Sequence, residues 1–117
     1  MEKTLEEKIK LLYIEDLMFS LFIIASLIDI IANEQSRTLL SNNKNLNEEL
    51  RQKYLFASYL ILFVFIFFME RNYNNLTMLN EDDEEYYWAK TRFIGSMLIV
   101  LGQIYVIYFY TNTTIFK

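Results

Sequence analysis

The sequence contains no cysteine, histidine or proline, and its only glycines are Gly95 and Gly102. Without cysteine the chain cannot form a disulfide scaffold, a zinc–thiolate site or an iron–sulfur cluster. Without histidine it lacks the usual general base, the commonest metal ligand and an imidazole ligand for haem. Two isolated glycines do not build a phosphate-binding loop. These absences argue against an ordinary soluble enzyme, and we expect no metal, no cofactor and no catalytic site of the chain's own.

Charge and composition restrict the partners. The formal net charge is −4, from 15 acidic and 11 basic residues. Because no basic stripe is present, we expect no nucleic-acid partner, and no motif indicates a small-molecule substrate. The composition favours Ile, Asn, Lys, Phe and Tyr, which are specified by A- and T-rich codons. This bias indicates an AT-rich genome, either organellar or low-GC bacterial.

The hydrophobic residues, 54% of the chain, are concentrated in three blocks separated by polar segments. Phe93–Tyr110 is 18 residues long and carries no charge. As a helix it is about 27 Å long, close to the roughly 30 Å hydrocarbon core of a bilayer. Tyr54–Met69 has 16 residues without a charge. Leu11–Ala32 is also of bilayer length, although it includes three acidic residues.

A membrane protein and a soluble helical bundle are the two alternatives for these blocks. A soluble helix carries charges on its outer face every three or four residues, and the second and third blocks carry none. Tyrosines and Trp88 also bracket the blocks, as in an interfacial aromatic belt. We therefore predict an all-α integral membrane protein with three transmembrane helices, at about 11–32, 54–69 and 93–110, forming a single three-helix domain over residues 1–117.

Two helix starts can be read from local signals. Asn47 precedes Glu48 and Glu49, which predicts the capped start of the second helix. Asn80 precedes five acidic residues, and acids in a first turn are stabilised by the helix dipole. The third helix is therefore expected to extend N-terminally, from Glu81. The acidic run also raises a calcium hypothesis, but it lacks the alternating ligands and the glycine of an EF-hand loop.

The basic residues do not decide the orientation. In a three-span arrangement six lysines and arginines fall on one side and five on the other. The positive-inside rule needs a clear excess. The topology is therefore left open.

Acidic and polar residues lie on one face of the first block. At 100° per residue, Glu15, Ser26, Asp29 and Asn33 share a stripe, while Asp16 lies 100° from Glu15. Glu15, Asp29 and Ser26 are candidates for a proton or cation path, or for contact with a partner subunit, because a charge inside a span is costly. In the alternative interpretation, the span starts after Asp16 and ends at Asp29, so that both ends are hydrated.

Small and polar residues recur at intervals of seven in the third block. Gly95, Ser96, Gly102 and Gln103 form a seam on one side of the predicted helix. Small residues allow helices to approach closely, and a buried amide can form a hydrogen bond across the contact. We favour a helix-packing interface over a substrate site.

The segment Ile14–Leu27 resembles the glutamate-bearing helix of subunit 4L of respiratory complex I, a small three-span protein. The family pattern of Leu-Glu followed by Met, Ser, Leu and Phe corresponds here to Ile14-Glu15 followed by Met18, Ser20, Leu21 and Phe22. The resemblance implies that Glu15 is a membrane carboxylate on a proton-translocation path. In the family a complete span precedes this helix and a second buried glutamate follows in the next one, whereas residues 54–69 contain no glutamate.

Taken together, these features predict a small integral membrane subunit of a larger membrane complex, with a respiratory complex as the expected setting. Its partners would be other membrane protein subunits and the lipid bilayer. The expected location is the mitochondrial inner membrane of an AT-rich organelle or the plasma membrane of a low-GC bacterium. Two alternatives stay open. One is a self-assembling protein such as a holin or small ion channel, and the other is a small membrane regulatory or immunity protein.

Overall fold

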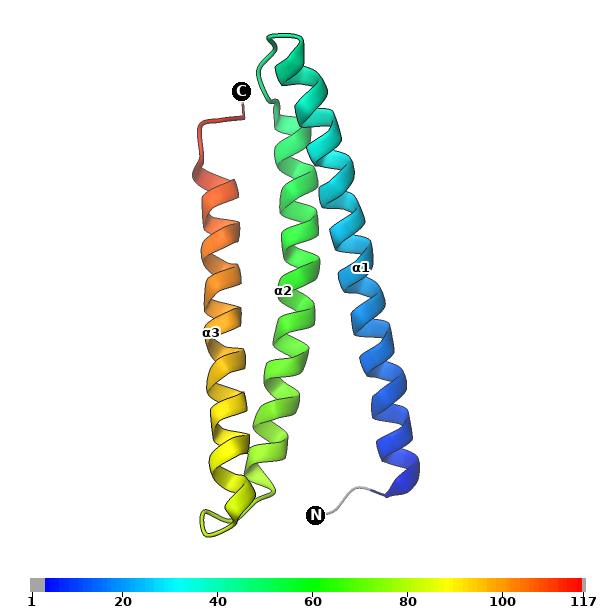
Figure 1. Ribbon diagram of the computed structural model, residues 1–117, viewed down its shortest axis with the longest axis vertical. Coiled ribbons are helices and arrows are strands. Elements are labelled where there is room, and N and C mark those ends of the chain that lie inside the picture. The colour runs from blue at the N-terminus through cyan, green and yellow to red at the C-terminus, as the bar shows by residue number, and fades with distance from the viewer. Residues whose placement is uncertain (1–3, 117) are drawn as a thin grey trace.

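Three long helices make up the structure, a computed structural model that describes residues 4–116 (Figure 1). They are α1 (Leu5–Ser41), α2 (Glu48–Thr77) and α3 (Glu84–Asn112). The described residues form no strand, and an isolated parallel bridge joins Leu46 to Phe116. The all-α architecture predicted from the sequence is therefore confirmed.

Each helix is long and apolar enough to cross a membrane. The predicted segments 11–32, 54–69 and 93–110 lie inside the three helices, which extend beyond them. With its 37 residues, α1 is the longest. At 1.5 Å per residue it measures about 56 Å, so its ends project well beyond a 30 Å hydrocarbon core. By length and composition, the chain is a three-span membrane protein.

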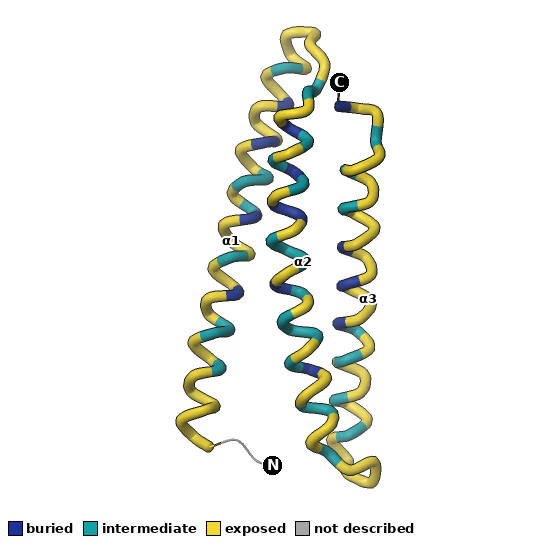
Figure 2. Tube along the Cα trace, turned by 180° about the vertical axis from the view of Figure 1, so that it is seen from behind, coloured by how far each residue is buried: buried dark blue, intermediate teal, exposed yellow. Residues whose placement is uncertain are grey.

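The three helices lie side by side with α2 in the middle (Figures 1 and 2). Both α1 and α3 pack against α2, but nowhere in residues 4–116 do α1 and α3 approach each other within 8 Å between Cα atoms. The resulting body is elongated and thin, with extents of 61 × 26 × 16 Å. Towards its N-terminal end α1 diverges from α2. The α1–α2 turn and the C-terminal segment lie at one end, and the α2–α3 turn at the other.

Residues buried between the helices recur every seven positions. This is the spacing of a left-handed helix pair in which side chains interlock along a seam. Alanines on the seam allow the α1 and α2 backbones to approach closely. The residues at this spacing are Met18, Ala25 and Ala32 of α1, Leu50, Ala57 and Val64 of α2, and Ser96 and Gln103 of α3.

The one buried apolar cluster identified among the described residues lies near the α1–α2 turn. It consists of Ala32, Leu50, Tyr54 and Phe116. The Tyr54 ring stacks on Tyr110 with 5.2 Å between ring centroids and 2° between planes. After α3 the chain folds back across this end, and Phe116 becomes 95% buried because it packs among the other three. The cluster therefore ties all three helices together.

One of the two predicted helix starts is found where expected. The Asn47 side chain accepts a hydrogen bond from the Leu50 amide at 3.0 Å and caps α2. The start of α3 was predicted too early: the helix begins at Glu84, with Asp83 at the cap position. The reason is a turn in which the Asp83 amide donates to the Asn80 carbonyl at 2.9 Å and the Asn80 amide donates to the Asp83 carboxylate at 3.0 Å. The first three acids of the run therefore belong to the turn.

Candidate functional site

The polar residues of α1 lie along the edge of its contact with α2. Glu15, Ser26 and Asp29 are each half-buried, whereas Asp16 is exposed. Glu15 and Asp29 are 14 residues apart, about 21 Å along the helix. The structure therefore places the two carboxylates on one stripe but at separate positions, with different surroundings.

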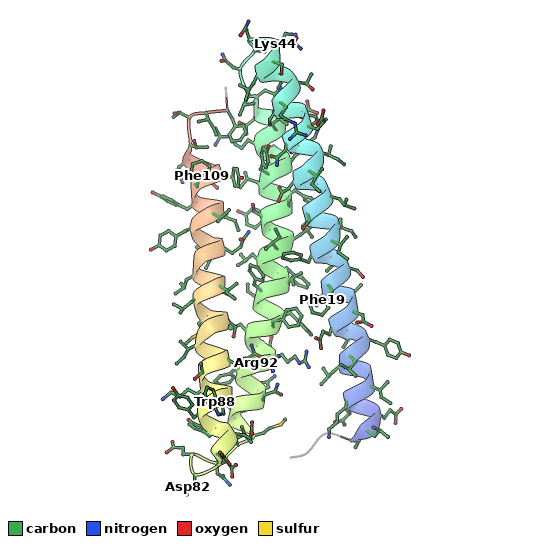
Figure 3. The ribbon with its side chains drawn as sticks, in the orientation of Figure 1. Phe19, Lys44, Asp82, Trp88, Arg92 and Phe109 are labelled. Carbon is green, nitrogen blue, oxygen red and sulfur yellow. The ribbon has the colours of Figure 1, made fainter. Side chains whose placement is uncertain are left out.

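Glu15 forms an ion pair with Arg71 of α2. Both side chains are only 22% exposed. Next to the pair, the ring of Phe19, on the side of α1 that faces α2 (Figure 3), packs against that of Phe68 with 5.4 Å between centroids. Sequence reasoning did not identify Arg71. The signal that could have identified it is its position seven residues after Val64, where it continues the row of buried α2 residues.

Asp29 has no ion-pair or hydrogen-bond partner among residues 4–116. Its half-buried carboxylate lies beside the tightest part of the α1–α2 contact, where Ala25 and Ala32 are completely buried. The neighbouring Ser26 hydroxyl donates to the Phe22 carbonyl of its own helix at 2.9 Å. Ser26 therefore makes no polar contact with α2, and Asp29 is the polar group available to an outside partner.

A polar network joins α1 to α2 one turn beyond Asp29. The Tyr54 hydroxyl donates to the Asn33 side-chain oxygen at 2.7 Å and lies 3.0 Å from the Ser36 hydroxyl. Ser36 also bonds to the Ala32 carbonyl at 2.9 Å. All three side chains thus have partners within the chain.

Besides those of Arg51, two side-chain hydrogen bonds join α2 to α3 in residues 4–116. Asn72 donates to the Ser96 hydroxyl at 3.0 Å, and Gln103 donates to the Ser58 carbonyl at 2.9 Å. Ser96 and Gln103, both expected in a packing seam, are buried in this contact.

The two glycines of the predicted seam lie outside the close contact. Gly95 is half-buried and Gly102 is exposed, and a Cβ atom added to either would meet nothing within 4 Å. Each precedes its polar neighbour by one residue and is therefore rotated 100° around the helix. Within the described chain, Ser96 and Gln103 hold α3 against α2, and the glycines do not serve a close approach of backbones.

Arg51 holds the C-terminal segment in place. Its guanidinium donates to the carbonyls of Tyr110, Thr111 and Thr113 at 2.7, 2.9 and 2.9 Å, and to that of Phe116 at 3.4 Å. It also lies 5.3 Å from the centroid of the Phe116 ring. Tyr110 and Thr111 belong to the last turn of α3, where a helix leaves carbonyl groups without partners, and Thr113 and Phe116 follow it. Arg51 was not identified from the sequence, because its partners are about 60 residues away.

The arrangement is suited to holding helices together. In the described residues, no group of three or more acidic side chains could hold a metal ion. No buried side-chain nitrogen or oxygen of residues 4–116 lacks a hydrogen-bond partner. Apart from Asp29, the polar groups of the helix contacts thus satisfy one another.

The chain matches no protein-family model, and no curated protein or solved structure shows significant similarity to it.

Proposed function

We propose that this protein is a small integral membrane subunit that works inside a larger membrane complex and contacts its neighbours through the face of α1 around Asp29. The observation that supports this proposal is the contrast between its two α1 carboxylates. Glu15 is paired with Arg71 inside the chain, and Asp29 has no partner in residues 4–116.

The contrast between Glu15 and Asp29 matters because a charge inside a membrane helix is costly. On insertion scales a carboxylate at the centre of a span costs roughly 2.5–3.5 kcal/mol and less towards the interface, and such groups usually face a partner or a water-filled space. Asp29 lies three residues before the end of the apolar segment 11–32, so it bears part of this cost. A basic or hydrogen-bonding side chain on a helix of another subunit would compensate this cost.

The open arrangement of the helices supports the same proposal. Because the backbones of α1 and α3 approach only that of α2 in residues 4–116, α1 and α3 each have a wide face that no other described helix covers. Large apolar side chains on these faces are more than half exposed, among them Ile30 and Leu98. Lipid covers such faces in a single chain, and helices of other subunits can cover them in a complex.

Within this proposal, we place the complex in a respiratory membrane, either mitochondrial or that of a low-GC bacterium. Support for this setting comes from the AT-rich composition and from the resemblance of Ile14–Leu27 to subunit 4L of complex I. The resemblance implies a proton-path role for Glu15, but its pairing with Arg71 supports a role in helix packing instead. Asp29 is then the carboxylate that can take part in proton transfer or in contact with a neighbouring subunit.

Co-purification tests the proposal. The chain is tagged in its native membranes, extracted in mild detergent and analysed by native gel and mass spectrometry. We expect it to co-migrate with a larger membrane complex that contains respiratory subunits. Asp29→Lys should reduce the co-purified complex several-fold, and Asp16→Lys, a change of the same charge at the exposed neighbour, should not.

Two results would contradict the proposal. The first is a chain that purifies alone as a symmetric oligomer and makes liposomes leak, which is the behaviour of a holin or small channel. The second is an equal loss of the complex in the Asp16 and Asp29 variants, because contact would then not depend on the α1 stripe.

A further inference from the structure

A groove between α1 and α2 has the chemistry of a phospholipid site. Its volume is about 600 Å³. Apolar side chains line one end, and charged and polar side chains line the other. The residues are Ile28, Ile31, Glu49, Gln52, Lys53 and Phe56. We propose that this groove binds the head group and the upper acyl chain of an aminophospholipid of the phosphatidylethanolamine type, taken from the surrounding bilayer.

The apolar end lies within the membrane-spanning part of the helices. Ile31 and Phe56 are 55% and 58% exposed, and Ile28 is half-buried beside them. All three belong to the apolar segments of α1 and α2. An acyl chain can pack against these three side chains without leaving a polar group unpaired.

The polar end lies at the edge of the apolar segment of α2, at the depth of lipid head groups. There the Lys53 ammonium is 2.6 Å from the Gln35 side-chain oxygen of α1 and 3.5 Å from the Glu49 carboxylate. An ammonium group has three donors, so one is left for a phosphate oxygen. Gln35 of α1 accepts this hydrogen bond from Lys53 of α2, and the contact positions the cation before a lipid arrives.

The pair of opposite charges explains why the ligand is an aminophospholipid. Its head group carries a phosphate, which complements Lys53, and a primary ammonium, which can donate hydrogen bonds to Glu49. A choline head group has no N–H to donate, and an anionic glycerol head group places no cation beside Glu49. The charge pattern therefore favours the zwitterion with a primary amine over both.

Native mass spectrometry in detergent tests this proposal. The protein is mixed with equal amounts of phosphatidylethanolamine, phosphatidylcholine and phosphatidylglycerol that carry the same acyl chains. Because Glu49 is 77% exposed, we expect a modest preference, about threefold for the ethanolamine lipid over the choline lipid. Glu49→Gln should remove this preference, and Lys53→Met should lower the binding of all three lipids.

Matched controls separate recognition from misfolding. Lys44→Met and Asp82→Asn remove the same charges at the two opposite ends of the molecule (Figure 3) and should leave the preference unchanged. Lys53→Arg keeps the cation and should keep the binding, and the helix content of every variant is checked by circular dichroism. Equal binding of the ethanolamine and choline lipids, a preference for the glycerol lipid, or a preference that survives Glu49→Gln would overturn the proposal.

Discussion

The ion pair of Glu15 and Arg71 joins the N-terminal half of α1 to α2. Removing charges from water is expensive, and a pair that is mostly buried stabilises the fold only as long as both members are present. Loss of one member leaves the other charge at the membrane edge without a counter-ion. We therefore expect the pair to specify the register between α1 and α2 more than to add stability.

Replacement of a single member of this pair should destabilise the protein more than replacement of both. We expect Arg71→Met to lower the free energy of unfolding by about 2 kcal/mol, because Glu15 is then left uncompensated. The double variant Glu15→Gln/Arg71→Met should recover most of this loss. Unfolding in mixed detergent micelles, followed by circular dichroism, measures all three proteins.

A second ion pair provides the control. Glu34 and Arg37 are paired on one helix, and their side chains are 67% and 66% exposed. Such exposed pairs contribute little, so Arg37→Met should change the unfolding free energy by less than about 0.5 kcal/mol. A double variant that is no more stable than Arg71→Met would contradict an energetic coupling of Glu15 and Arg71.

Arg51 should be irreplaceable by lysine. Its planar guanidinium contacts four carbonyls, two in the last turn of α3 and two in the C-terminal segment, and a lysine ammonium cannot match this fork. We expect Arg51→Lys to increase amide hydrogen exchange over residues 111–116 and to cost about 1–3 kcal/mol. Unchanged exchange in this segment would show that the packing of Phe116 alone holds it.

At the scale of the helices, Asn47 and Asn80 each precede acidic residues in the sequence, but they have different roles in the structure. Asn47 caps α2 with its side chain, whereas Asn80 lies in a turn three residues before the Asp83 cap position. Asn47→Ala should therefore cost about 1 kcal/mol of unfolding free energy. Asn80→Ala should cost much less, since only its backbone takes part in the turn. Thermal unfolding of both variants compares them, and equal losses would contradict the assignment.

The same comparison shows how far the sequence determines the fold. Apolar length and the Asn47 signal predict the helices and the start of α2, because these depend on residues close in the chain. The turn at Asn80–Asp83 competes with an earlier helix start, and local preference alone does not decide between them. Pairs such as Glu15–Arg71 and Asn72–Ser96 depend on how the helices align. The seven-residue spacing limits these alignments but does not choose among them.

For the candidate site, sequence reasoning identified positions better than roles. Ser96 and Gln103 were expected in a seam and lie in the α2–α3 contact, whereas the neighbouring glycines do not. The α1 stripe contains both carboxylates, but the sequence pattern does not distinguish Glu15 from Asp29. Their difference comes from Arg71, a residue on another helix. A periodic pattern predicts on which face of a helix a residue lies, but only the packing of the helices determines its partner.

At the scale of the whole molecule, three antiparallel spans have a consequence that can be measured directly. The α1–α2 turn and the C-terminal segment lie at one end of the body, and the α2–α3 turn at the other. If all three helices cross the bilayer, Lys44 and Asp82 are on opposite sides of the membrane (Figure 3). The even distribution of basic residues does not decide which side of the membrane Lys44 or Asp82 occupies. The two residues must nevertheless lie on different sides.

The absence of cysteine from the sequence makes this test clean, because a single introduced thiol is the only one that can react. Lys44→Cys and Asp82→Cys, each exposed in a turn, are labelled in sealed vesicles with a membrane-impermeant maleimide, before and after the vesicles are opened. We expect one variant to react before opening and the other only afterwards. A third variant, Thr114→Cys, should behave like Lys44→Cys, because the C-terminal segment lies at the same end. Reaction of all three variants in sealed vesicles would mean that the helices lie on the membrane surface and do not cross it.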